Sequence, residues 1–408
     1  MTIRMDLLIQ LFAQALDMVE IDFLGVTTNH GKRVAVLCAA MGRHLGMSDP
    51  VLSDLVSCAL LHDNALTEYI LMQNGREEDD PNFGAHCEMG QRNAEILPFN
   101  GDISGYILYH HEQADGKGLF KLSEGSYPLG AELIAVSDML DAEYHLEGIS
   151  LQELPSIREK IKVKIHSRYT ARAGNALLDV LDAAMLASLQ NSEIAKTVSR
   201  SIPVWTIEMG NPVLVPISEL ISRIIDYKSK STGIHTQQIA NRSWLMAEYY
   251  GYDMTEKIRL YLAAALHDIG KLAIPAKILE KPGPLDDEEY EIIKTHVSYT
   301  RSLLGAIDGL ELIAEWASSH HEKLDGSGYP RGSTAANMDF NSRLLACIDV
   351  YQAICEERPY HYTRGHSETM AILYKMAEKG AIDPVIVKDM DLVMAQWSGK
   401  DVEMPRVN

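Results

Sequence analysis

The sequence predicts an all-α protein built from two related helical domains. Apolar residues recur at helical spacing, as in "DPVLSDLVSCALLHD" and "MTEKIRLYLAAALHD". Runs that alternate polar with β-branched residues, which would indicate strands, are few. One spacing of histidines also occurs twice along the 408 residues. A period this long indicates a duplicated domain rather than a solenoid.

The helical pattern can be followed from the N-terminus. Residues 1–20 form an amphipathic pattern, and its acidic residues argue against a signal peptide. Asp286 is expected to begin a helix, because Glu289 three residues later completes a capping-box pattern. Glycine and proline in "ILEKPGPLD" and "DGSGYPRG" predict loops. Three prolines between positions 200 and 217 mark a boundary, so we expect a helical domain at 1–195, a linker at 196–217 and a second helical domain at 218–408.

Both predicted domains carry the same set of histidines and aspartates. The first set is His30, His62, Asp63, His86, His110, His111 and Asp138. The second set is His235, His267, Asp268, His296, His320, His321 and Asp349. In each set the first two histidines are 32 positions apart. The third histidine and the start of the histidine pair are also 24 positions apart in both sets, from His86 to His110 and from His296 to His320.

These residue types indicate metal binding. Neutral imidazoles together with carboxylates suit iron, manganese, zinc and similar divalent ions. A single histidine would more often be a core residue satisfied by hydrogen bonds, but a duplicated set with ligand chemistry favours a metal site. Adjacent histidines such as His320 and His321 can serve one cluster only near the end of a helix.

Composition restricts the class of partner. A net charge of −20 argues against broad docking on DNA, RNA or anionic lipid, but not against a small anionic substrate at a metal site. No apolar run approaches the roughly 18 residues of a membrane span. Five cysteines without a CxxC motif are typical of small buried residues in a reduced compartment, so we expect a cytoplasmic protein.

The second domain resembles a known family. "HDIGKLAIPAKILEKPGPL", the later His296, "HHEKLDGSGYP" and "RLLACIDVYQA" followed by "RPY" occur in the order of the HD-GYP domain, a subgroup of the HD metal-dependent phosphohydrolases. The resemblance covers about residues 210–395. It implies tandem HD-type helical domains, of which the C-terminal one is HD-GYP. It also implies hydrolysis of a 3′–5′ linked cyclic dinucleotide, cyclic di-GMP or 3′,3′-cyclic GMP-AMP, to a linear dinucleotide, and it leaves open further cleavage to mononucleotides.

The same resemblance implies roles for single residues. The metal ligands would be His235, His267, Asp268, His296, His320, His321 and Asp349. Asp268 would bridge two divalent ions, with iron or manganese as the expected metals. Lys271 would hold the scissile phosphate or protonate the leaving oxygen. Gly328, Tyr329 and Pro330 would shape the substrate wall, and Arg358 would pair with a phosphate.

Three positions depart from the family pattern. Ser231 stands where some members have a glutamate that supports a third metal, so we expect two metals. Gln352 replaces an aspartate three residues after Asp349, and His361 replaces a basic residue. Gln352 and His361 keep open the alternative of a cyclic-dinucleotide-binding regulatory module without turnover. A general HD nucleotidase is another alternative, which the Gly-Tyr-Pro loop argues against in the second domain and which stays open for the first. The sequence also leaves open a homodimer.

The first domain keeps every candidate ligand but lacks their partners. Leu66 stands where Lys271 would be, and Leu119 and Phe120 replace Tyr329 and Pro330. One interpretation is a second metal centre with weak or altered activity. The other is a decayed copy whose histidines persist as packing residues in a sensing or dimer-forming domain.

Overall fold

The computed structural model describes residues 2–24, 28–66, 68–69, 83–208, 216–220, 222, 225, 235–355 and 365–396. The all-α prediction is confirmed. Within these ranges the named strands are β1 (Thr2–Arg4) and β2 (Thr206–Glu208), which pair in a two-stranded sheet. None of the helices in the described part combines the length and apolar character that a bilayer crossing requires.

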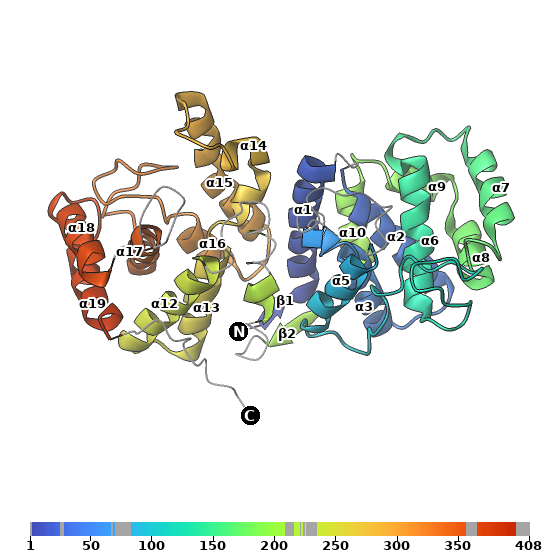
Figure 1. The fold of residues 1–408 in the computed structure, drawn as a ribbon, viewed down its shortest axis with the longest axis horizontal. Coiled ribbons are helices and arrows are strands. Elements are labelled where there is room, and N and C mark those ends of the chain that lie inside the picture. The colour runs from blue at the N-terminus through green and yellow to red at the C-terminus, as the bar shows by residue number, and fades with distance from the viewer. Residues whose placement is uncertain are drawn as a thin grey trace. The chain divides into compact units, whose positions relative to one another are not determined.

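The packing of the backbone divides the chain into two units (Figure 1). The N-terminal unit comprises Arg4–Ile207, and the C-terminal unit comprises Glu208–Asn408 together with Met1–Ile3. The segment that we expected to be a linker contains the end of helix α10 (Ile194–Ser201) and strand β2.

The N-terminal unit is a set of helices around α2 (His30–His44). Helices α3, α6, α8 and α10 all pack on α2. Besides α2 and α10, its elements are α1 (Met5–Leu24), α3 (Asp49–Leu60), α5 (Ala85–Glu95), α6 (Leu129–Tyr144), η1 (Leu146–Gly148), α7 (Leu154–Lys164), α8 (Ala171–Val180) and α9 (Ala183–Ser188).

The C-terminal unit repeats the central part of this arrangement. Its elements are α12 (His235–Tyr249), α13 (Met254–Leu266), η2 (Ile269–Ala273), α14 (Ala276–Leu279), α15 (Asp287–Gly305), α16 (Glu311–Ala317), α17 (Phe340–Cys355), α18 (His366–Glu378) and α19 (Pro384–Met394). Helix α12 packs on α13 and α17, as α2 packs on α3 and α6. The duplication seen in the sequence is therefore also a duplication of helix packing.

Local sequence signals explain where the key helices of the C-terminal unit begin. The predicted capping box at the start of α15 is confirmed, because Asp286 Oδ1 accepts a hydrogen bond from the Glu289 backbone N–H at 2.9 Å. Helix α13 has the same device, with Asp253 Oδ1 at 2.8 Å from the Glu256 N–H. Such caps satisfy N–H groups that have no partner within the helix. They place the N-terminal ends of α15, which carries His296, and of α13, which His267 follows directly.

Candidate metal centres

Six of the predicted residues of the second set come together in the C-terminal unit, and we call them the C-terminal cluster. His267 directly follows α13, His296 lies within α15, and Asp349 lies within α17. The full cluster is His267, Asp268, His296, His320, His321 and Asp349. His320 and His321 stand in the turn after α16, which agrees with the expectation that a histidine pair serves one cluster near a helix end.

Asp268 lies among the imidazoles of this cluster. Its Oδ2 is 3.2 Å from His267 Nε2, and its Oδ1 is 3.5 Å from His296 Nε2 and 3.8 Å from His320 Nε2. The side chain of Asp268 is 4% exposed. Although buried, its Oδ1 has no hydrogen-bond partner among the described residues. A buried carboxylate oxygen is costly to leave unsatisfied, so this atom indicates a site built for a cation.

Asp349 supplies a second carboxylate to the cluster. Its Oδ1 is 3.8 Å from His267 Nε2 and its Oδ2 is 3.8 Å from His321 Nδ1. These separations are too long for good hydrogen bonds. Imidazole and carboxylate donors therefore face one another across gaps that an ion would fill.

Backbone carbonyls orient the three innermost imidazoles. Nδ1 of His267, His296 and His320 lies 2.7, 2.6 and 2.5 Å from a carbonyl oxygen three residues earlier in the chain. A carbonyl only accepts, so each Nδ1 carries the proton. In the neutral form of each imidazole the Nε2 lone pair is then directed into the cluster, as hydrogen bonds from the other ring nitrogen direct the histidine ligands of metal sites.

The charge states of the cluster suit a cation. Burial disfavours an ionised Asp268, but His267 and Lys271 hold the pKa of this carboxyl well below its usual range. Burial lowers the pKa of His296 to about 4 and that of His320 well below its usual range. At neutral pH these two imidazoles are neutral, which is the form that binds metal ions.

A close contact between α15 and η2 sets the distance between His267 and His296. A Cβ added to Gly270 would lie 1.9 Å from the His296 carbonyl oxygen, so only glycine allows this approach. Thr300 locks the contact, because its Oγ1 accepts from the Gly270 N–H and donates to the His267 carbonyl, each at 3.0 Å. The "HDIG" segment is thus held against the helix that carries His296.

Lys271 points back at the cluster, as its position after His267 predicts. Its Nζ lies 2.5 Å from Asp268 Oδ2, and its side chain is 28% exposed. It is therefore an ion-paired lysine at the edge of the cluster rather than a solvated surface charge. One ammonium can contact both the Asp268 carboxylate and a ligand that enters from solvent.

The loop with the Gly-Tyr-Pro segment is anchored beside the histidine pair. The buried carboxylate of Glu322 accepts hydrogen bonds at 2.8 Å from the backbone N–H groups of Arg331 and Ser333. The Tyr329 ring lies 4.8 Å from the His321 ring, centroid to centroid. The loop is packed so tightly at Gly328 that a Cβ there would be 2.4 Å from the Lys323 nitrogen.

This packing leads to a prediction for Gly328→Ala. The added methyl group would overlap the backbone, so the loop must shift, and we expect a loss of about 1–3 kcal/mol in unfolding free energy. Chemical denaturation of the variant and the wild type measures this difference in unfolding free energy. Gly305→Ala is the control, because a Cβ at Gly305 meets nothing within 4 Å. Equal stability of the two variants would contradict the packing described for this loop.

The first set of residues forms an N-terminal cluster with the same plan. It contains His30, His62, Asp63, His86, His110, His111 and Asp138. Asp63 Oδ1 is 3.6 Å from His110 Nε2 and 4.0 Å from His86 Nε2, and Asp63 Oδ2 is 3.3 Å from His62 Nε2. As in the other unit, Nδ1 of each of these three histidines lies 2.5–2.8 Å from a carbonyl three residues earlier.

The loop after the histidine pair is also repeated. Glu112 accepts hydrogen bonds from the Phe120 and Leu122 N–H groups at 2.6 and 2.7 Å. A Cβ on Gly118 would lie 2.5 Å from Glu112 Cα, the counterpart of the contact at Gly328. The shared "HHE…DG.G" string therefore encodes one loop structure. In the N-terminal copy Leu119, which stands in place of Tyr329, is 40% exposed.

The N-terminal cluster has a buried polar network behind its first histidine. Asp141 Oδ2 is 2.7 Å from His30 Nδ1, and Asp141 Oδ1 accepts from Arg33 Nε at 2.7 Å. On its other side His30 Nε2 lies 3.1 Å from Asp138 Oδ1. Gln352 holds the position of Asp141 in the C-terminal unit, where it donates to Gln238 at 3.0 Å. The first unit thus retains the aspartate that the second has lost.

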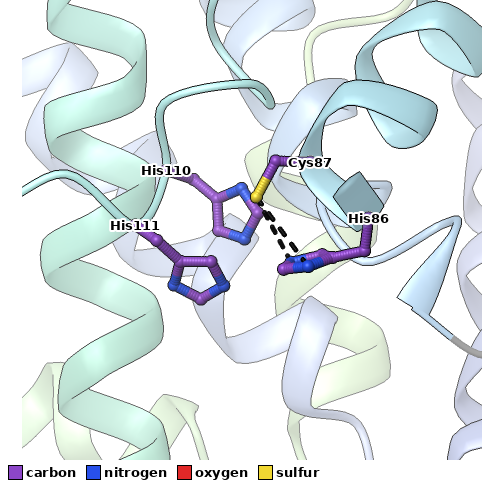
Figure 2. Close-up of side chains that lie close together, drawn as sticks. All are labelled: His86, Cys87, His110 and His111. Atoms are coloured by element: carbon purple, nitrogen blue, oxygen red, sulfur yellow. Dashed lines mark hydrogen bonds between the residues drawn. The ribbon is translucent and has the colours of Figure 1, made fainter. Parts of the chain in front are cut away.

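One residue in the N-terminal cluster was missed by the sequence analysis. Cys87 Sγ lies 3.3 Å from His86 Nε2, and both residues are completely buried (Figure 2). Burial alone would raise the pKa of the Cys87 thiol, but His110 and His86 lower it to about 7. Val297 occupies the matching position after His296, so the thiol belongs to the N-terminal copy alone.

The side chains of two predicted site residues, Arg358 and His235, cannot be placed. Arg358 lies outside the described residues, as do Ser231 and His361. His235 is the first residue of α12, matching His30 at the start of α2, but its side chain lies outside the described part.

Comparison with known proteins identifies part of the chain. Residues 219–386 match the HD domain family. The chain carries an HD domain. This HD domain contains the entire C-terminal cluster, together with Lys271 and the Gly-Tyr-Pro loop. The N-terminal cluster lies outside the matched residues.

The similarity of the chain to known proteins extends beyond the HD domain. The 3′3′-cGAMP-specific phosphodiesterase 1 of Vibrio cholerae is 29% identical over 386 residues, which are 91% of this chain and 87% of that protein. A cyclic di-GMP phosphodiesterase of Thermotoga maritima is 37% identical over 149 residues, 36% of this chain and 40% of that protein. A crystal structure of a cyclic GMP-AMP-specific phosphodiesterase of Vibrio cholerae, V-cGAP3, matches with a TM-score of 0.66 and 21% identity, covering 97% of this chain and 99% of that one. Both units thus share their fold with that protein.

Proposed function

We propose that the HD domain hydrolyses a 3′–5′ linked cyclic dinucleotide, cyclic di-GMP or 3′,3′-cyclic GMP-AMP, to a linear dinucleotide. The observation that carries this proposal is the buried Asp268, whose Oδ1 is unsatisfied within the described residues and lies among imidazole Nε2 atoms. Relatives named as phosphodiesterases for these two nucleotides support the choice of substrate.

The donor set fits two divalent cations. Oriented imidazoles and ionised carboxylates are ligands that iron and manganese accept. In this proposal Asp268 would help to hold both ions, since its two oxygens face different histidines. The other ligands would be His235, His267, His296, His320, His321 and Asp349. When bound, such a pair lowers the pKa of a shared water and neutralises charge on the phosphodiester.

The protein's own residues would position the nucleotide. Lys271 is held at the cluster edge by Asp268, so its ammonium can donate to a phosphate oxygen or give a proton to the leaving 3′ oxygen. The Tyr329 ring beside His321 would form one wall of the substrate site. Arg358 would pair with a phosphate through its planar guanidinium.

The direct test is a substrate panel with the full-length chain. Cyclic di-GMP and 3′,3′-cyclic GMP-AMP are incubated with the protein and Mn²⁺ or Fe²⁺, and linear products are resolved chromatographically. We expect ring opening of at least one nucleotide, and its loss when a chelator removes the metal. A His267→Ala/Asp268→Ala double variant is the negative control. Intact nucleotides after prolonged incubation of metal-loaded wild type would refute the proposal.

Gln352 supports a second candidate function, binding without turnover. Its buried side chain bonds to Arg242 and Gln238, and it supplies a neutral amide where the N-terminal unit has a carboxylate. A missing outer carboxylate weakens metal binding by about 10–100-fold in other metal sites. Tight binding of an intact cyclic dinucleotide to metal-replete protein, without product, would favour this regulatory role.

A further inference from the structure

Four side chains of the N-terminal unit form a compact group of nitrogen and sulfur donors. One ligand atom from each of His86, Cys87, His110 and His111 lies within 4.8 Å of the others. Figure 2 shows the Cys87 sulfur and the three rings gathered in one place. We call this the thiol–imidazole group. It shares three histidines with the N-terminal cluster and adds a sulfur that the C-terminal cluster lacks.

The histidines of this group are prepared as metal ligands. His86 Nδ1 and His110 Nδ1 each lie 2.5 Å from a backbone carbonyl, which leaves Nε2 as the lone-pair nitrogen. His110 is fully buried, and its Nε2 has no hydrogen-bond partner among the described residues. A buried nitrogen in this state needs an explanation, and a metal ion bound beside it provides one.

The spacing is close to that of a four-coordinate ion. With bonds of about 2.0 Å to nitrogen and 2.3 Å to sulfur, the ligand atoms of a tetrahedral zinc site lie roughly 3.3–3.7 Å apart. The Cys87 Sγ to His86 Nε2 distance of 3.3 Å already falls in this range. All four ligand atoms lie within 4.8 Å of one another, so no separation exceeds this range by more than about 1.5 Å, which rotation of an imidazole ring can close.

The donors differ in kind from those of the HD domain. Thiolate is a soft ligand and selects zinc and similar thiophilic ions, whereas the C-terminal cluster offers imidazoles and carboxylates without a thiolate, which suits harder ions. The matching residue in the HD domain, Val297, is buried and apolar. The change from valine to cysteine therefore alters the metal preference of one copy only.

The surroundings of the group disfavour hydrolysis. Leu66 replaces the lysine that sits at the edge of the C-terminal cluster. The Phe83 ring covers the group, with its centroid 4.4 Å from that of His86 and 5.6 Å from that of His111. Structural zinc sites are closed with four protein ligands, while catalytic ones keep an open position.

We propose that the N-terminal unit binds a thiophilic divalent metal, of which zinc is the type, through Cys87, His86, His110 and His111, as a closed and non-hydrolytic site. The Cys87 thiol releases its proton to solvent when the metal binds. The ion joins the start of α5 to the turn at 110–111 and thereby stabilises this unit. The site would bind its metal whether or not the HD domain hydrolyses a cyclic dinucleotide.

X-ray absorption on zinc tests the proposal without relying on activity. The full-length chain carrying His267→Ala and Asp268→Ala, which removes the competing cluster, is loaded with one equivalent of Zn²⁺. We expect one sulfur neighbour at about 2.3 Å with nitrogen neighbours at about 2.0 Å. The same protein loaded with Co²⁺ should show sulfur-to-cobalt charge-transfer absorption in the near ultraviolet.

Single cysteine variants assign the sulfur. In the same background, Cys87→Ser should lose the sulfur shell and the charge-transfer band, and the rise in melting temperature on adding Zn²⁺ should shrink. Cys58→Ala, which changes another buried cysteine of the same unit, should keep all three signals. Zinc bound by nitrogen and oxygen alone, a sulfur signal that survives Cys87→Ser, or no zinc binding at all would each overturn the proposal. If Cys87→Ser does not fold, the parent spectrum still decides, because it reports sulfur directly.

Discussion

Asp268→Asn is expected to abolish hydrolysis of the cyclic dinucleotide. The substitution keeps the shape of the side chain but removes the negative charge that faces His267, His296 and Lys271. An amide cannot bridge two cations as a carboxylate does, because only one of its two terminal atoms is an acceptor. We expect kcat to fall at least as far as the roughly 10²–10³-fold loss that follows removal of one charge-stabilising group in other enzymes. Steady-state assays with saturating Mn²⁺ measure it.

Metal content separates this explanation from misfolding. Asp268→Asn should bind less than the wild-type amount of metal at the HD domain while keeping its circular dichroism spectrum. Glu291→Gln is the matched control, because Glu291 lies on α15 as His296 does but is exposed and pairs only with Lys294 among the described residues. Near wild-type turnover by Asp268→Asn would remove the bridging carboxylate from the proposed mechanism.

Much of the fold and of the two clusters could be predicted from residue order. Helical periodicity, the capping box at Asp286 and the repeated histidine spacing depend on short-range or strictly repeated features, which sequence shows directly. The expectation that His320 and His321 share one cluster rested on a helix ending nearby, and α16 does end at Ala317. These signals are local, or they are copied between the two domains.

The missed residues depend on tertiary packing. Neighbouring positions on a helix point about 100° apart, so nothing in the sequence indicates that Cys87 lies with His110 as well as beside His86. The sequence signal for this residue is the difference between the two copies, since a cysteine follows His86 where a valine follows His296. Asp141 was recognisable in principle, because "DMLDA" keeps in the first domain the aspartate that Gln352 replaces in the second.

Under the two proposals above, one scaffold supports a different kind of metal chemistry in each unit. Both keep the carbonyl-oriented imidazoles and the glutamate-anchored loop. They differ at the positions proposed to position the nucleotide: Lys271 against Leu66, and Tyr329 against Leu119. The N-terminal unit has lost the residues that would handle a phosphodiester, and it has gained a sulfur donor.

Lys271→Leu installs the residue that the N-terminal copy has at this position, and we expect it to reduce kcat by about 10²–10⁴-fold. The Lys271 ammonium is close to Asp268 but about a quarter exposed, so it can reach a bound phosphodiester. Its loss removes both a positive charge and a proton donor for the leaving 3′ oxygen. Metal content should stay at the wild-type level, because Lys271 has no lone pair to offer while it is protonated. Lys277→Leu, an exposed lysine six residues later, is the control for a change of charge alone.

The choice of substrate and of replacement separates the two roles of Lys271. A phosphodiester with an activated aryl leaving group needs no proton donor, so Lys271→Leu should slow its hydrolysis much less than that of a cyclic dinucleotide if Lys271 acts as the acid. Lys271→Arg keeps the charge but yields its proton poorly, since the guanidinium pKa is above 12. Recovery by arginine, with equal losses for both substrates in Lys271→Leu, would assign Lys271 to phosphate binding. Undiminished turnover in Lys271→Leu would exclude both roles, and the ion pair with Asp268 would then serve only to hold the carboxylate in place.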